Sequence, residues 1–184
     1  MKTVTIIGFN GALASAITGM IDLFRLAGVT WARIHGEQPT AWFRTRLLTE
    51  DGEPCRCING VPLLADGSWQ DIDELGADDL LIIPTIGAPI DEVLQTNPLL
   101  IQWLSKFQTA TPGDVRVASN CTGAFLLAAA GLLDGREATT HWGFGEQFRR
   151  QFPAVNLHAD KLVTVDSQNL ISVDDFTADH FLFG

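Results

Sequence analysis

The chain has few cysteines, few basic residues and no long apolar run, and each shortage excludes a class of protein. Three cysteines in 184 residues cannot all pair within one chain, so we expect free thiols rather than a disulfide framework. The longest apolar runs, such as Ala124 to Ala130, are too short to cross a bilayer, and the first residues lack the apolar region of a signal peptide. The sequence therefore predicts a cytoplasmic protein that does not enter a membrane.

Basic side chains are outnumbered by acidic ones. The chain has 12 Lys and Arg against 22 Asp and Glu, which gives a net charge of −10. Such a surface repels the phosphate backbone of nucleic acids, so we do not expect this chain alone to bind DNA. The length and the 46% hydrophobic content fit one packed domain over residues 1–184, and no repeat or linker indicates a second domain within them.

Short apolar strands alternate with amphipathic helices along the chain. The patterns predict strands at Thr3–Ile7, Phe43–Thr49, Leu80–Ile83, Val115–Ser119, Lys161–Val165 and Leu170–Val173, with a hairpin at the sheet edge between Cys55 and Leu64. They predict helices from Leu13 to Ala27, from an Asn97 cap to Phe107, from Gly123 to Ala130 and from Gly143 to Phe152, with another starting at Phe176. The alternation predicts an α/β fold with a mostly parallel, doubly wound sheet, helices on both faces and Leu80–Ile83 near its centre.

Cys121 stands where the strand ending at Ser119 passes directly into a helix. The small residues that follow it, Thr122, Gly123 and Ala124, let the helix pack close to the strand, as in a nucleophile elbow. The N–H groups and the dipole at a helix start favour thiolate over thiol, so we expect an unusually low pKa for Cys121. A cysteine that merely fills a crowded turn is the alternative interpretation. The strand, turn and helix context favours a functional site.

His141 ends a short β-prone run, and a parallel sheet would place its imidazole at the same carboxyl-end edge as Cys121. The two side chains form the candidate catalytic pair. The candidate ligand-binding residues lie on the loops expected around this pair, namely Asn10, Gly11, Thr85, Ile86, Gly87, Asn120, Cys121, Thr122, Thr140 and His141. Cys55 and Cys57 lack a second Cys or His pair at zinc spacing, so we interpret them as small residues of a half-buried strand, and we expect no metal and no cofactor.

Two segments, Ala118 to Leu127 and Gly131 to Trp142, closely resemble the ThiJ/PfpI branch of the class I glutamine amidotransferase-like superfamily. Within that branch they are most similar to the N-terminal domains of AraC-type transcriptional regulators. The resemblance runs from about Val4 to Val173 and fades after Ser172, where Val173, Asp174 and Asp175 replace small residues. It implies a flavodoxin-like sandwich that forms a homodimer and senses a small-molecule effector. It also implies a C-terminal helix-turn-helix domain in the full-length protein, which would make the contacts to DNA and which this chain does not contain.

Two departures from the enzymes of that branch favour sensing over catalysis. Those enzymes place an acidic residue near the first strand–helix junction, whereas here no Asp or Glu occurs before Asp22. Glutaminase-type triads place a Glu two residues after the His, whereas position 143 is Gly. Without an acid to orient the base, we expect a non-catalytic sensor of a small polar metabolite. The alternative is a Cys-dependent hydrolase or hydratase that acts on a small amide, nitrile or aldehyde.

The charge balance yields a direct test. We expect this chain alone to give no shift of duplex DNA in a low-salt gel at micromolar protein, because its net charge of −10 opposes contact with phosphates. A shift that disappears on addition of salt would contradict this expectation.

Overall fold

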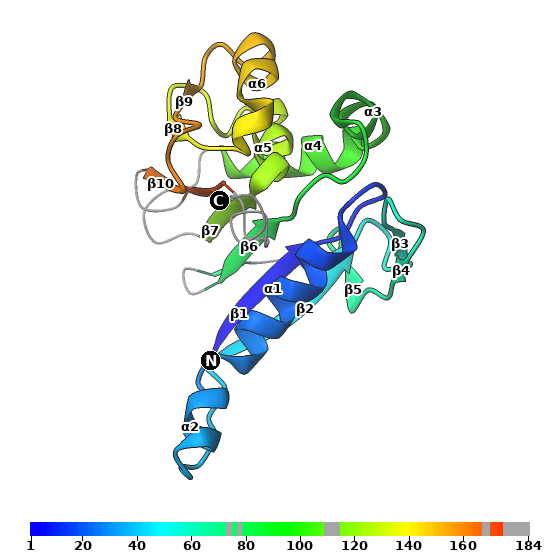
Figure 1. The fold of residues 1–184 in the computed structure, drawn as a ribbon. Helices are drawn as coiled ribbons and strands as arrows, with labels where there is room; N and C mark the ends of the chain where they lie inside the picture. The colour runs from blue at the N-terminus through cyan, green and yellow to red at the C-terminus, as the bar shows by residue number, and fades with distance from the viewer. Residues whose placement is uncertain (73–74, 77–78, 109–114, 167–169, 175–184) are drawn as a thin grey trace.

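The computed structural model describes residues 1–72, 75–76, 79–108, 115–166 and 170–174, and its centre is a seven-stranded sheet (Figure 1). The strand order is β10-β11-β7-β6-β1-β2-β5, and every neighbouring pair is parallel except β10 with β11. The bounds are β1 Lys2–Ile7, β2 Phe43–Thr49, β5 Gly67–Ser68, β6 Leu80–Ile83, β7 Arg116–Asn120, β10 Val163–Asp166 and β11 Leu170–Val173. The predicted mostly parallel sheet is confirmed.

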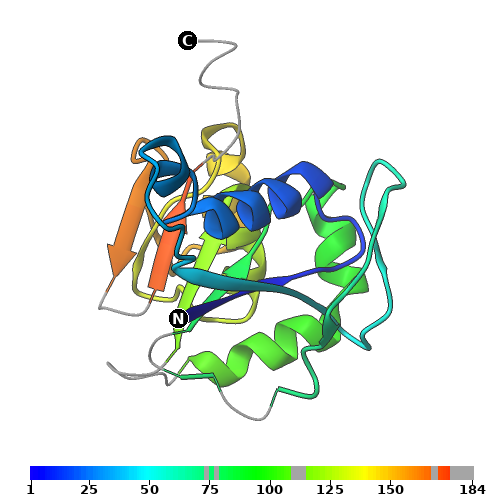
Figure 2. The ribbon, with the colours of Figure 1, turned by 90° about the horizontal axis from the view of Figure 1, so that it is seen from below.

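Helices lie on both sides of this sheet, and Figure 2 shows α1 and α4 on opposite sides of the strands. The α-helices are α1 Ala14–Leu26, α2 Thr30–Ile34, α3 Ile90–Thr96, α4 Pro98–Leu104, α5 Ala124–Ala129 and α6 Gly145–Gln151. Short 3₁₀ turns are η1 Ser105–Phe107, η2 Cys121–Gly123 and η3 Trp142–Phe144. The patterns in the sequence predicted α1, α4, α5 and α6, whereas α2 and α3 were missed. No helix among the described residues is long and apolar enough to span a bilayer.

The strand predicted to be central is indeed central, because β6 lies between β1 and β7. Leu81 and Ile83 are fully buried on one face, and Ile82 is 5% exposed on the other. A strand that packs against side chains on both faces can be apolar at every position, which is why its sequence shows a continuous run rather than alternation. Its carboxyl end delivers Pro84 and Thr85 to the edge where the candidate site is built.

The expected hairpin forms, but it is not part of the main sheet. Its strands, β3 Cys55–Arg56 and β4 Pro62–Leu63, make a separate antiparallel pair, and the edge position belongs to β5. The hairpin bonds instead to the loop after β1, where the Gly11 N–H donates to the Arg56 carbonyl. The prediction of an edge hairpin is therefore wrong in its placement, because the backbone groups of this segment pair with a loop rather than with a strand.

Asn97 stands at the N-cap position of α4 as predicted, but its side chain does not cap that helix. The Asn97 side chain donates from Nδ2 to the Val93 carbonyl, 2.8 Å away, and so bonds the last turn of α3 rather than the start of α4. Helix α4 begins at Pro98, which needs no hydrogen bond at its nitrogen. The helix predicted to start at Phe176 lies outside the described residues.

Helix α5 approaches β6 closely at Gly123. A Cβ added there would lie 2.5 Å from the Ile83 carbonyl oxygen and 2.7 Å from that of Pro84. Backbone atoms of a buried strand cannot yield to such a contact. Any larger residue would push the helix start, and Cys121 with it, away from the sheet.

We expect Gly123→Ala to lower the free energy of unfolding by about 1–3 kcal/mol, because the added methyl overpacks this contact. Gly19→Ala is the matched control, since Gly19 lies exposed in α1 and a Cβ there meets nothing within 4 Å. The control should be stabilised by about 0.5–1 kcal/mol through helix propensity. Urea denaturation of the three proteins measures both effects. Equal stabilities for Gly123→Ala and the parent would refute the close approach.

Candidate ligand site at the Cys121 elbow

Cys121 occupies a strained turn between β7 and the helical segment that follows. Its φ of 54° is the only positive value among the described residues other than glycine, and its side chain is 5% exposed. A residue with a Cβ adopts the left-handed region at a cost of about 1–2 kcal/mol, so packing on both sides must hold it there. The predicted sharp turn is thus present, and it places the thiol at the start of the η2 and α5 segment.

The loop after β6 is bonded to this turn through side chains. The Thr85 hydroxyl donates to Asn120 Oδ1 over 2.6 Å. The Ile86 N–H donates to the Thr122 hydroxyl over 3.0 Å, and this hydroxyl donates in turn to the Ile86 carbonyl over 3.1 Å. All these groups are buried, so the bonds fix the position of the loop relative to Cys121.

The first loop joins the same cluster through its backbone. The Gly11 carbonyl accepts from the N–H of Gly87 at 2.8 Å and from that of Ala88 at 3.1 Å. Gly11 has a φ of 89°, a conformation that favours glycine. Of the ligand-binding residues predicted from sequence, Gly11, Thr85, Ile86 and Gly87 are therefore brought beside Asn120, Cys121 and Thr122.

Asn10 is oriented differently. Its Oδ1 accepts from the Arg56 N–H at 2.8 Å, which fixes the side chain to the hairpin. It lines a separate cavity of about 140 Å³ together with Glu50, Asp51 and Cys55. The side chain of Asn10 thus contributes to a different surface from that of Cys121.

The segment that carries His141 is joined to the elbow in a way that the sequence did not predict. The run before it forms β8, Glu137–Ala138, which pairs with β9, Asn156–Leu157, in a separate two-stranded sheet. The expectation that a strand of the main sheet delivers this imidazole is therefore wrong. The link is a side chain instead, because the Thr140 hydroxyl donates to the Cys121 carbonyl over 3.0 Å.

The hydrogen bond at the His141 ring determines which nitrogen carries the proton. Nδ1 accepts from the Gly143 N–H at 3.0 Å, and His141 thereby caps the η3 turn with its own side chain. A neutral ring whose Nδ1 accepts carries its hydrogen on Nε2, so Nε2 is a donor. In a catalytic triad the arrangement is reversed, with Nδ1 donating to an acid and Nε2 accepting the proton of the nucleophile.

Several buried polar groups near the elbow have no partner among the described residues. Asn120 Nδ2 is one, and the others are the hydroxyls of Ser119, Ser172 and Thr164, which stand side by side across β7, β11 and β10. A buried donor without a partner costs about 1–3 kcal/mol, which a ligand or an ordered water recovers. These groups give the part of the sheet beside the elbow, on β7, β11 and β10, an affinity for polar atoms.

A buried carboxylate also lies next to the elbow, and the analysis of the sequence missed it. Asp174 directly follows Val173, which pairs with Asn120, and its residue is 5% exposed. Its N–H donates to the Leu162 carbonyl over 2.8 Å and so holds the end of β11 in place. The alternation of Leu170 and Ser172 on one face of β11 is the signal that could have found it, because Asp174 continues that pattern.

Cys55 and Cys57 are buried thiols whose pKa values are raised. Both are 4% exposed. Desolvation raises the pKa of Cys57 to about 11, and the nearby Cys55 adds to the rise. Desolvation also raises the pKa of Cys55, partly offset by hydrogen bonds. Neither thiol ionises near neutral pH.

The model of the DJ-1/PfpI family matches residues 2–182. The chain belongs to the DJ-1/PfpI family. The resemblance to ThiJ/PfpI proteins seen in the sequence is thereby confirmed, and so is the fold that it implied. A solved structure of an AraC family transcriptional regulator from Pseudomonas putida has a TM-score of 0.66 at 18% identity, covering 94% of this chain and 83% of that one.

Relatives of this DJ-1/PfpI domain include both regulators and an enzyme. The HTH-type transcriptional regulator CdhR of Pseudomonas aeruginosa is 32% identical over 130 residues, which are 71% of this chain and 36% of CdhR. The isonitrile hydratase of Pseudomonas putida is 30% identical over 101 residues, which are 55% of this chain and 41% of that enzyme. The aligned parts thus cover less than half the length of these two relatives.

Near pH 7 we expect iodoacetamide to modify Cys121 before Cys55 or Cys57, because the helix start favours the thiolate of Cys121. Cys57 should become reactive only as the pH approaches its pKa of about 11. Mass spectrometry of tryptic peptides at short reaction times measures the order. Faster labelling of Cys55 or Cys57 in the folded protein at pH 7 would show that the elbow does not activate its thiol.

Proposed function

We propose that this domain binds a small polar effector at the Cys121 elbow, without turning it over, on behalf of a transcriptional regulator. The observation that carries the proposal is the hydrogen bond from the Gly143 N–H to His141 Nδ1. It leaves Nε2 as a donor, so the imidazole is arranged to hold an acceptor rather than to take a proton from a thiol.

The groups around the elbow suit a ligand with hydrogen-bond acceptors. Asn120 Nδ2 has no partner among the described residues, and the N–H groups at the helix start offer further donors. A small carboxylate or amide satisfies donors of this kind through charge-assisted or neutral hydrogen bonds. The first loop, which is bonded to the residues after Thr85, carries no acid that could orient the thiol.

The regulator part of the proposal rests on the relatives. CdhR is an HTH-type regulator by name, and this chain aligns with 36% of its length. We infer that the domain acts in a homodimer and that a helix-turn-helix domain, C-terminal to this one in the full-length protein, makes the contacts to DNA. Effector binding at the elbow would then alter DNA binding through that second domain.

We expect thermal-shift screening of small carboxylates and primary amides to find a compound that stabilises the parent. Asn120→Ala and Cys121→Ser should weaken its binding by about tenfold or more, because the first removes a buried amide donor and the second replaces an ionisable thiol with a hydroxyl that stays neutral. Cys57→Ser is the matched control, since its thiol is equally buried but lies on the hairpin segment, and it should bind like the parent. If the control loses as much affinity as the other two variants, the ligand site is elsewhere.

One observation favours a second function. The buried carboxylate of Asp174 at the end of β11 could orient a base at the elbow, and the isonitrile hydratase shows that a relative is an enzyme. A Cys-dependent hydrolase or hydratase would turn over amides, nitriles or aldehydes at about 10 per second, and both Cys121→Ser and Asp174→Asn would abolish that rate. Such a result would replace the sensor assignment. The sensor predicts slow or no turnover in all three proteins.

A further inference from the structure

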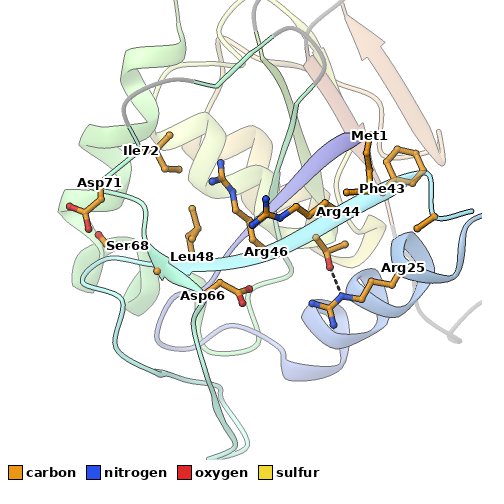
Figure 3. Close-up of a pocket in the computed structure, with 13 residues that line it drawn as sticks. Met1, Arg25, Phe43, Arg44, Arg46, Leu48, Asp66, Ser68, Asp71 and Ile72 are labelled. Atoms are coloured by element: carbon orange, nitrogen blue, oxygen red, sulfur yellow. Dashed lines mark hydrogen bonds between the residues drawn. The ribbon is translucent and has the colours of Figure 1, made fainter.

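The outer edge of β2 is open along the first part of the strand. Strand β5 pairs with β2 only at Leu48 and Thr49, so among the described residues no strand lies beside Phe43 to Arg46 on that side. A pocket of about 920 Å³ opens along this edge (Figure 3). Its polar and charged lining includes Arg25, Arg44, Arg46, Asp66, Ser68 and Asp71.

Two of the three arginines are anchored in the same way. Arg46 donates from Nε to the Thr5 hydroxyl over 2.8 Å, and Arg25 donates from Nε to the Thr45 hydroxyl over 2.7 Å. Both hydroxyls belong to buried threonines. Because each anchor uses Nε and a neutral acceptor, it fixes the guanidinium while leaving its charge and its terminal N–H groups for another partner.

The arginines of this pocket are not neutralised by ion pairs with carboxylates of the described residues. Arg44 and Arg46 lie two apart on β2, and Figure 3 shows their side chains extending from the same side of the strand. Within the described part of the chain, none of the three arginines forms an ion pair. The Asp66 carboxylate accepts from the Leu47 N–H at 2.8 Å, and Asp71 lies at the opposite end of the pocket from Arg25 in the view of Figure 3. Neighbouring like charges repel one another until a counter-charge arrives.

We propose that this pocket binds a small organic molecule through a phosphate or carboxylate group held between Arg44 and Arg46. Planar guanidinium groups match these oxyanions with paired hydrogen bonds. Phe43 and Ile72 supply apolar wall for the carbon part of such a ligand. The site is separate from the elbow, since it follows the edge of β2 whereas Cys121 stands at the carboxyl end of β7.

Edge protection is the other role that arginines on an open strand can have. Charged side chains on an edge strand prevent pairing with other chains, and this role requires no bound anion. The two roles differ in their response to added anions. They also differ in the response to Thr5, whose hydroxyl matters only if the guanidinium of Arg46 must be held in one place.

The test measures thermal unfolding and calorimetric binding with sodium phosphate and with sodium succinate, each against sodium chloride at equal ionic strength. We expect at least one of the two oxyanions to stabilise the parent beyond chloride, and the more effective one identifies the ligand as a phosphate or a carboxylate. Arg44→Gln and Arg46→Gln should weaken its binding by about tenfold or more, because each removes a charged donor. Arg33→Gln, an exposed arginine on α2 outside the pocket, is the control and should leave it unchanged.

Measurements on three variants separate a built site from general charge effects and from binding at the elbow. Thr5→Val keeps the net charge but removes the anchor of Arg46, and we expect it to weaken oxyanion binding several-fold. Arg44→Gln should raise the melting temperature at low salt without oxyanion, since it relieves repulsion from Arg46. Cys121→Ser should bind the oxyanion like the parent, which keeps this result independent of the elbow. Phosphate and succinate that act no better than chloride, or an equal loss in Arg33→Gln, would overturn the proposal.

Discussion

The close contact between the start of α5 and the end of β6 is the constraint on which the site depends. A Cβ at Gly123 would lie 2.5 Å from the Ile83 carbonyl oxygen, so the helix can begin there only with glycine. The chain must then change from extended at Asn120 to helical within one residue. Cys121 takes up that change with a φ of 54°, and its thiol is fixed at the helix start as a consequence.

The polar residues around the thiol serve mainly to hold the loops together. The hydroxyls of Thr85, Thr122 and Thr140 each donate to a neighbouring loop or turn, and so position the site rather than offering themselves to a ligand. A ligand is left with the imidazole of His141 and with buried groups that have no partner among the described residues, such as Asn120 Nδ2. Donors that are held in place in this way, with the hydrogen of the neutral His141 ring on Nε2, are suited to binding a hydrogen-bond acceptor.

The charged side chains of the domain are also divided between two places, with arginines at the edge of β2 and a buried carboxylate near the elbow. The chain carries a net charge of −10, yet three of its 12 basic residues line one pocket at the edge of β2. Threonine hydroxyls hold two of these arginines without neutralising them. The buried carboxylate of Asp174 lies instead at the end of β11, beside the elbow. An acidic protein can therefore hold a local positive site, because interactions between exposed charges are screened beyond about 10 Å.

The sequence by itself determined most of the parallel strands, four of the α-helices and the turn at Cys121, because hydrophobic periodicity and small residues act over a few neighbouring positions. It did not determine where the hairpin at Cys55 or the strand before His141 would pair, since pairing depends on which backbone groups meet in space. It also could not reveal that His141 Nδ1 accepts from Gly143, or that Asp174 comes to lie beside Asn120. The bond from Gly143 depends on the backbone conformation of the η3 turn, and the burial of Asp174 depends on the pairing of β11 with β7. Only the folded structure decides both, because each requires backbone groups to be placed in space and β11 and β7 lie far apart in the chain.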